Sequence, residues 1–347
     1  MRILHLLAGA PTGGAETFAL DAIEALDQRG VAQTVIARPH PLLLDRLRTL
    51  GIPFVPASFS RLSRLFGARR KIAAAAEAFR ADLIHAWMGR AASFVPEQRS
   101  CPALGWFGGY YHLRRFRHLD WFTGVTPDIA AHIARGGAPY SRVSVVHTFG
   151  TLAKAAPLVR GELGVPEDAP LLLVLSRMHP KKGIDTMLAA LARLPGVHLL
   201  LAGDGPRLAV YRKLAVQLGV DQRAHFLGWR TDRAALLATA DICVLPSRYE
   251  PFGTVIAESW ASHKPLVATS AQGARQFVVD GENGLVVPID DEAALADAIS
   301  RLLADPSLRA RLIAGGEAAY EANFQRDGVT GRMIENYRQA IAAGRVI

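Results

Sequence analysis

Short apolar runs alternate with stretches of helical periodicity along the whole chain of 347 residues. In the first half the runs cover residues 3–7, 34–37, 54–56, 83–87, 103–107, 122–125 and 143–147. In the second half they cover 171–176, 197–202, 224–227, 242–245, 266–269 and 284–287. Strands that alternate with helices form parallel sheets covered by helices on both faces. Because the pattern plays out twice, it predicts an α/β protein with two Rossmann-like domains.

The predicted domain boundary lies between His147 and Pro170, where periodicity is lost and Gly and Pro occur. The chain is also longer than the size at which one hydrophobic core usually stops growing. We therefore expect a first domain over residues 1–155 and a second over 156–330.

Composition indicates a globular protein, because half of the residues are hydrophobic and a fifth are charged. No apolar run reaches the roughly 18 residues that a membrane span needs, and the first residues resemble a strand more than a signal peptide. Cys101 and Cys243 lie far apart, and Cys243 sits in an apolar run. These features favour reduced thiols in a cytoplasmic protein.

The net charge of +9 is concentrated in the first half of the chain. One basic cluster comprises Arg61, Arg64, Arg69, Arg70 and Lys71, and another comprises Arg114, Arg115, Arg117 and His118. Leu62, Leu65 and Phe66 interleave with the first cluster, which is typical of a patch that touches an anionic membrane. An ordinary solvated basic face explains it equally well. No nucleic-acid-binding motif is present, so we expect no nucleic-acid partner.

Two carboxylates, Glu250 and Glu258, flank a loop and helix start that follow the apolar run 242–245. In open α/β sheets, ligands bind at the loops that leave the carboxyl ends of the strands. Free N–H groups near Gly253 and Thr254 suit a phosphate. The segment therefore predicts a site for a ligand that combines phosphate with hydroxyl-bearing rings.

Other loops at strand ends carry further candidates. Arg177 and Lys182 follow the first strand of the second domain and suit a diphosphate, although a solvated basic loop is the alternative. Gly13 and Gly14 precede the first helix and permit close approach to phosphate, but most Gly-Gly pairs are ordinary turns. A nicotinamide-binding Gly-x-Gly-x-x-Gly pattern is absent. Trp229, after Gly228, stacks on a base or sits half-buried at a rim.

In the first domain, Tyr110, Tyr111 and His112 follow a strand and a glycine-rich turn. The tyrosines suit stacking on a sugar face, and His112 suits hydrogen bonding to a sugar, although most histidines are structural. No His, Cys, Asp and Glu cluster has metal-ligand spacing, and no Asp-x-Asp triplet occurs. We therefore expect no metal and no cofactor, with cations and helix dipoles offsetting the negative charge of the phosphate-bearing ligand.

Several motifs occur in the order typical of one enzyme family. They are Thr12-Gly-Gly-Ala-Glu16, Ser176-Arg-Met-His-Pro-Lys-Lys-Gly183, Gly203-Asp-Gly-Pro206, Phe226-Leu-Gly-Trp229, Glu250-x7-Glu258 and Asp280-Gly-Glu-Asn-Gly-Leu-Val-Val-Pro288. With them the whole chain resembles the retaining glycosyltransferases of family 4, which have the GT-B fold. The resemblance implies a last helix, about 331–347, that crosses back onto the first domain.

The resemblance also implies roles for these residues. Arg177, Lys182 and the backbone of Phe252, Gly253, Thr254 and Val255 would bind the donor diphosphate, with Gly205 beside the nucleotide. Glu258 would bind the ribose, and Glu250 and His112 the donor sugar. The acceptor would occupy the first domain.

We therefore expect a retaining, metal-independent glycosyltransferase that moves a hexose from a UDP- or GDP-linked sugar to a saccharide or lipid-linked acceptor. Lipopolysaccharide, capsule or exopolysaccharide assembly at the inner face of the cytoplasmic membrane is the expected setting. A sugar-nucleotide epimerase of similar fold and a non-catalytic glycolipid-binding scaffold are the alternatives.

Overall fold

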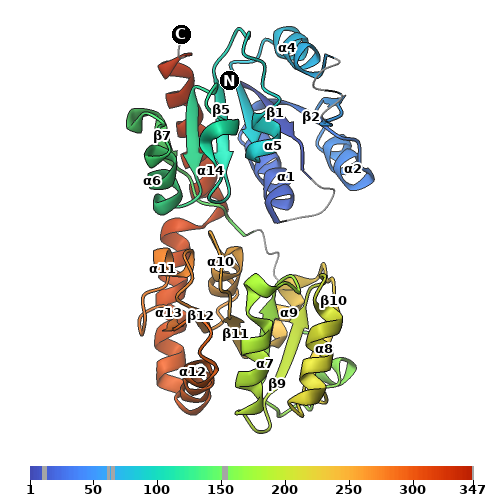
Figure 1. Cartoon of the computed structure of the whole chain (residues 1–347), viewed down its shortest axis with the longest axis vertical. Helices are drawn as coiled ribbons and strands as arrows, with labels where there is room; N and C mark the ends of the chain where they lie inside the picture. Colours follow the sequence, from blue (N-terminus) through green and yellow to red (C-terminus); the bar gives the residue numbers. More distant parts are fainter. Residues whose placement is uncertain (10–13, 61–62, 64–66, 151–154, 346–347) are drawn as a thin grey trace. The chain divides into compact units, whose positions relative to one another are not determined.

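The computed structural model describes residues 1–9, 14–60, 63, 67–150 and 155–345, and the chain divides into two compact units (Figure 1). Unit 1 comprises Met1–Phe149 together with Arg326–Ile347, and unit 2 comprises Gly150–Gln325. The divisions fall a few residues before the expected ones at 155/156 and 330/331. Unit 1 is thus discontinuous in sequence, and unit 2 is inserted into it.

Unit 1 is built on a parallel sheet of seven strands in the order β3-β2-β1-β4-β5-β6-β7. The strands are β1 (Arg2–Leu7), β2 (Ala32–Ala37), β3 (Phe54–Pro56), β4 (Leu83–Trp87), β5 (Ala103–Phe107), β6 (Trp121–Gly124) and β7 (Val143–Val145). The helices are α1 (Gly14–Asp27), α2 (Pro41–Thr49), α4 (Ala68–Phe79), α5 (Met88–Ala92), α6 (Pro127–Arg135) and α14 (Arg326–Ala343), with short 3-10 turns η1 (Leu113–Arg115) and η2 (Tyr140–Arg142). Continuous buried runs such as β4 and β5 reflect a sheet covered on both faces.

Helix α14 returns to unit 1 and packs beside α1 (Figure 1). The Tyr337 hydroxyl lies 2.7 Å from His85 Nδ1, and Asn336 accepts a hydrogen bond from Trp121 Nε1 at 2.8 Å. Arg142 donates to the carbonyl of Gly344 at 2.9 Å. The last helix therefore completes the core of the unit made by the first part of the chain.

Unit 2 is built on a parallel sheet of six strands in the order β10-β9-β8-β11-β12-β13. The strands are β8 (Leu171–Leu175), β9 (His198–Ala202), β10 (Ala224–Gly228), β11 (Ile242–Leu245), β12 (Leu266–Thr269) and β13 (Leu285–Val287). The helices are α7 (Ile184–Ala192), α8 (Leu208–Gln217), α9 (Arg233–Thr239), α10 (Thr254–Ala261), α11 (Ala274–Phe277), α12 (Glu292–Ala304) and α13 (Pro306–Asn323), with 3-10 turns η3 (Arg160–Leu163) and η4 (Pro180–Lys182).

In each sheet the strand order reverses beside the first strand. The chain moves outward from β1 through β2 to β3 and restarts at β4, and in unit 2 it restarts at β11 after β8, β9 and β10. Such switch points open a crevice at the carboxyl ends of the strands, where ligands bind in this class of fold. The predicted α/β class with two parallel sheets is confirmed.

The two cysteines are free and buried. Burial raises the pKa of the Cys243 thiol to about 12, which keeps it protonated and unreactive. Across the described ranges, no helix has both the length and the apolar character that crossing a membrane requires.

Candidate functional site

The loops at the carboxyl edge of the unit 2 sheet are braced against one another by backbone hydrogen bonds. Arg248 N and Tyr249 N donate to the carbonyl of Lys181 at 2.9 and 3.1 Å. Gly273 N donates to the carbonyl of Glu250 at 2.6 Å. The loops after β8, β11 and β12 thus form one rigid platform that holds the predicted residues.

Glycine is required where these loops meet most closely. A Cβ on Gly183, which has φ +62°, would lie 1.9 Å from the Pro246 carbonyl oxygen. A Cβ on Gly205, with φ +159°, would lie 2.6 Å from the Met178 carbonyl oxygen. Backbone cannot yield at such distances, so both turns depend on the absence of a side chain.

An ion pair joins the loop after β8 to the loop after β11. Lys182 Nζ lies 2.5 Å from Glu250 Oε2, and both side chains are largely buried, with 22% and 14% exposed. The Ser247 hydroxyl lies 3.5 Å from the same carboxylate oxygen. Pairing holds both charged ends in place at the switch point.

Arg177 follows β8 directly and differs from Lys182. Its side chain is exposed and makes no hydrogen bond or ion pair with any residue that the structure describes. Lys181, its other basic neighbour, lies over the ring of Tyr249 with Nζ 4.4 Å from the ring centroid. Arg177 is therefore the cation of this loop that remains available to an anionic ligand.

Helix α10 begins at the same edge, directly after the loop of Glu250. Gly253 caps it in the left-handed conformation, with φ +85°, and no described side chain caps its first turn. Phe252 and Gly253 are buried, whereas Thr254 and Val255 are half-buried. The N–H groups of a first helical turn have no partners within the helix and carry the positive end of its dipole. This turn can bind an anion.

Glu258 lies in a different environment from Glu250. Its side chain is only 1% exposed, and Oε1 lies 2.5 Å from Nη1 of Arg233 on α9. A Cβ on Gly150 would approach Glu258 Cγ to 2.9 Å, so backbone covers the carboxylate stem. The sequence analysis identified neither the Arg233 partner nor the covering Gly150.

Trp229 follows β10 with 61% of its surface exposed, so its ring is accessible for stacking. The carbonyl of Gly228 accepts a hydrogen bond from Gly203 N at 2.7 Å, which joins this turn to the loop after β9. Arg230 next to it is paired with Asp232.

In unit 1, Tyr110, Tyr111 and His112 line one hollow of about 520 Å³ at the carboxyl ends of β1, β4 and β5. The Tyr110 hydroxyl donates to the Asp128 carboxylate. Tyr111 stacks on Phe116, with ring centroids 6.3 Å apart, and His112 is exposed. The structure thus brings these three residues together.

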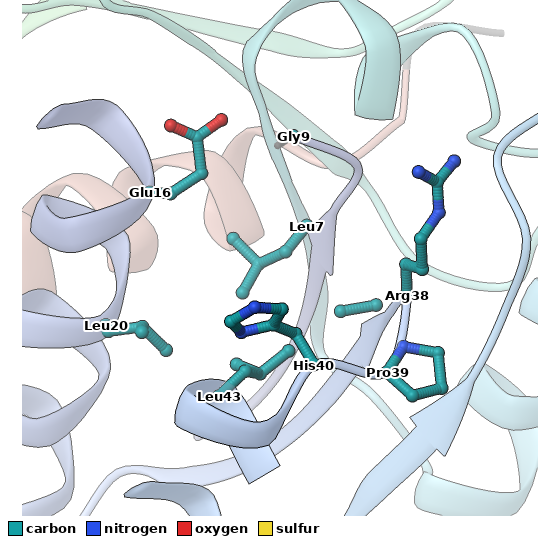
Figure 2. A pocket seen from close by; sticks show the side chains of 9 residues that line it. Leu7, Gly9, Glu16, Leu20, Arg38, Pro39, His40 and Leu43 are labelled. Carbon is teal, nitrogen blue, oxygen red and sulfur yellow. The ribbon is translucent and has the colours of Figure 1, made fainter. Parts of the chain in front are cut away.

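A second, smaller cavity of about 60 Å³ adjoins that hollow and shares Gly9 and Glu16 with it (Figure 2). Leucines form its apolar wall, and the imidazole of His40 points into it. His40 Nδ1 is buried and has no hydrogen-bond partner among the described residues. The sequence analysis overlooked His40 and Arg38, although polar residues directly after β2 were the available signal.

Some predicted residues have no structural description. Gly13, Arg61 and Arg64 lie outside the described residues, as do Leu62, Leu65 and Phe66, whereas Gly14 is the first residue of α1.

Two of the three described members of the first basic cluster are engaged locally. Arg69 donates to the Ser93 carbonyl at 3.2 Å and pairs with Glu97 at 3.4 Å. Lys71 donates to the Pro56 carbonyl at 2.6 Å, and Arg70 is exposed.

Two doubly wound parallel units, each with polar loops at the carboxyl edge of its sheet, define the GT-B class of α/β proteins. Residues 12–149 match the family model of Glycosyltransferase Family 4, and residues 157–319 match Glycosyl transferases group 1. The chain therefore belongs to the family 4 glycosyltransferases, as its motifs predicted.

Full-length relatives agree with this assignment. The chain is 35% identical to the lipopolysaccharide core biosynthesis glycosyltransferase LpsE of Rhizobium meliloti, over 96% of this chain and 98% of that protein. It is 30% identical to LpsD of the same organism, over 99% of each chain. The fold is similar to that of Anabaena HepE in complex with UDP and glucose, with a TM-score of 0.86 and 23% identity over 97% and 99% of the two chains.

Proposed function

We propose that this glycosyltransferase moves a hexose from a UDP- or GDP-linked sugar to a saccharide or glycolipid acceptor, with retention of anomeric configuration and without a metal. The relatives named for lipopolysaccharide core biosynthesis and the UDP complex of HepE support this class of substrate. The observation that carries the proposal is the Lys182–Glu250 pair beside the α10 N-terminus.

Unit 2 would bind the donor through its cations and helix dipole. Arg177 offers a guanidinium fork to the diphosphate, and the first turn of α10 offers N–H groups. Lys182 would turn from Glu250 toward the phosphates, which frees the Glu250 carboxylate to accept a hydrogen bond from the sugar. Trp229 would lie near the base.

Glu258 would bind the ribose hydroxyls. In the structure its carboxylate is buried against Arg233, so ribose binding requires that Arg233 release or share it. Glu258 would therefore act in the site together with its partner Arg233.

The chemistry follows from these groups. The acceptor hydroxyl would attack the anomeric carbon from the face that the diphosphate leaves. As the bond from that carbon to the phosphate oxygen breaks, the oxygen takes the acceptor proton. Arg177, Lys182 and the α10 dipole offset the negative charge that develops, which is the work a divalent ion does in metal-dependent enzymes. Glu250 positions the sugar and forms no covalent bond to it.

The setting we propose is surface-polysaccharide assembly, with the enzyme in the cytoplasm and reversibly associated with an anionic membrane. Donor turnover with and without acceptor separates this activity from its rivals. An epimerase converts the nucleotide sugar without acceptor, and a scaffold leaves it unchanged.

Calorimetry with UDP and GDP tests the donor site. Arg177→Ala and Lys182→Ala should each weaken binding of the preferred nucleotide by roughly tenfold to a hundredfold, because a charge-assisted contact contributes about 1.5–3 kcal/mol. Lys181→Ala, the neighbouring control, should change it little. Equal losses at all three positions would indicate nonspecific attraction. The reaction is also run in EDTA, and the anomeric configuration of the product is determined by NMR. An inverted anomer would contradict retention, and loss of activity in EDTA would contradict metal independence.

A further inference from the structure

Three exposed arginines lie on one turn of unit 1 that a buried aromatic ring holds in place. We call Arg114, Arg115 and Arg117, on η1 and just after it, the arginine ridge. Phe116, between them in sequence, is fully buried and stacks on Phe107 with ring centroids 3.9 Å apart. Gly105 makes room for it, since a Cβ there would lie 2.7 Å from Phe116 Cδ1. The buried ring fixes the turn and leaves the arginines exposed.

The ridge lies where three hollows meet. Arg115 lines both the 520 Å³ hollow of the tyrosines and a second hollow of about 490 Å³. Arg114 lines that second hollow and a third of about 390 Å³, where Arg117 and His112 also lie. The ridge therefore borders each of the three hollows, whose volumes lie in the range of ligand sites.

Positive charge dominates this surface. None of the three ridge arginines forms an ion pair or side-chain hydrogen bond with a residue that the structure describes. The carboxylates that line the hollows are those of Glu16 and Glu97, and Glu97 already pairs with Arg69. Unpaired guanidinium groups around a concave surface attract and orient anions.

We propose that the arginine ridge binds anionic substituents of the acceptor, phosphate or carboxylate groups on a saccharide, and so selects an anionic acceptor. The inference rests on the proposed function and names the substrate class of its acceptor side. The donor diphosphate has its own cations in unit 2, Arg177 and Lys182, which leaves the ridge to another anion. Guanidinium forks bind phosphate and carboxylate bidentately, so the ridge fixes orientation as well as charge. Tyr110 and Tyr111, on the adjoining hollow, would contact the sugar rings.

The test uses Arg114→Ser combined with Arg115→Ser. Arg48→Ser combined with Arg80→Asn removes the same charge from the same unit and serves as the control, since neither residue lines a described hollow. The probe is deacylated lipopolysaccharide core oligosaccharide, used with its anionic groups intact and after dephosphorylation and methyl esterification. Acceptor binding and acceptor KM are measured, with nucleotide affinity and melting temperature as internal references.

The wild type should bind the anionic probe at least tenfold more tightly than the neutralised one. The ridge variant should lose that preference and raise the acceptor KM at least tenfold, while nucleotide affinity and melting temperature stay unchanged. Arg114→Lys with Arg115→Lys should retain part of the preference, because charge remains and the fork is lost.

Three results would overturn the inference: equal wild-type binding of both probes, an equal loss in the control variant, or an unchanged preference in the ridge variant. Co-sedimentation with phosphatidylglycerol and phosphatidylcholine vesicles distinguishes binding of an anionic acceptor from contact with an anionic membrane. If the ridge variant loses only anionic vesicle binding, the surface is a membrane contact and the inference fails. Absence of nucleotide binding in the wild type would instead refute the proposed function, whatever the saccharide results.

Discussion

At the scale of residues, Glu250 and Glu258 occupy different surroundings, so substitutions at the two positions should change different kinetic constants. Glu250 pairs with Lys182 on a loop, whereas Glu258 is buried against Arg233. Glu250→Gln should mainly lower kcat, because the proposed contact with the sugar supports the transition state. Glu258→Gln should mainly raise the donor KM, because ribose is bound equally in substrate and transition state.

Steady-state kinetics and melting temperatures of both variants check this prediction. Unchanged kinetics with a lowered melting temperature at both positions would make the glutamates structural.

Gly183 offers a second residue-scale prediction. Gly183→Ala should destabilise the protein by roughly 2–5 kcal/mol, because the left-handed backbone disfavours Ala and the new methyl group meets the Pro246 carbonyl. Gly196→Ala is the matched control, since Gly196 has φ +73° with no atom near its Cβ position and should cost only about 1–2 kcal/mol. Urea unfolding of both variants gives the two values. Equal destabilisation would show that the loop contact contributes nothing.

The places of single residues at the strand ends of unit 2 were predictable, but the pairs that they form were not. Arg177, Lys182, Glu250 and Gly253 follow strands, and strand ends can be read from apolar periodicity. The Lys182–Glu250 pair joins residues 68 positions apart, and it depends on how two loops pack. The burial of Glu258 likewise comes from elements that its own sequence neighbourhood does not reveal.

At the scale of elements, the strands of unit 1 bury a histidine network whose protonation is unfavourable. Trp87 Nε1 donates to His5 Nδ1 at 3.2 Å, so the neutral His5 ring donates through Nε2 to Gln33 at 3.0 Å. Burial lowers the His5 pKa to about 4 and the His85 pKa well below its usual value. Both rings are thus neutral in the folded protein at neutral pH.

Stability should therefore fall with acidification. The unfolded chain takes up the His5 proton near pH 6.5 and the folded protein only near pH 4, so the contribution is fully present above pH 6.5 and is lost between these values. The His5 share is at most about 3 kcal/mol. Melting temperatures from pH 7 to pH 4.5 should show a shallower slope for His5→Gln than for the wild type. The exposed His112→Gln variant controls for loss of a histidine, and identical slopes for wild type and His5→Gln would contradict the assignment.

The start of the last helix was less predictable than the strands or the start of α10, which begins at Thr254 as expected. Apolar runs that cross a buried sheet are continuous, so their positions differ from the predicted ones by only a few residues. Helix α14 begins at Arg326, before the expected residue 331. Its buried residues, such as Val329 and Met333, are interspersed among polar ones, so apolar periodicity did not mark this start. The resemblance to a family indicated where this helix packs, and its own periodicity did not.

At the scale of the whole molecule, the main feature is that unit 2 lies in sequence between the two segments of unit 1. The repeated strand pattern predicted two units, but periodicity alone does not show that the first unit closes with the last helix. That closure depends on contacts such as Tyr337 with His85, between residues 252 positions apart in the sequence.

The same closure sets the order of folding on the ribosome. When Phe149 has been translated, unit 1 still lacks α14, and the nascent chain holds a sheet whose His85 has no Tyr337 to bond. Unit 2 is complete at Gln325, while α14 is still being synthesised or lies in the exit tunnel. The unit whose synthesis begins first is therefore finished last, because it cannot close until α14 has left the exit tunnel. For this chain, folding during synthesis cannot simply follow the usual order from the N-terminal domain onward.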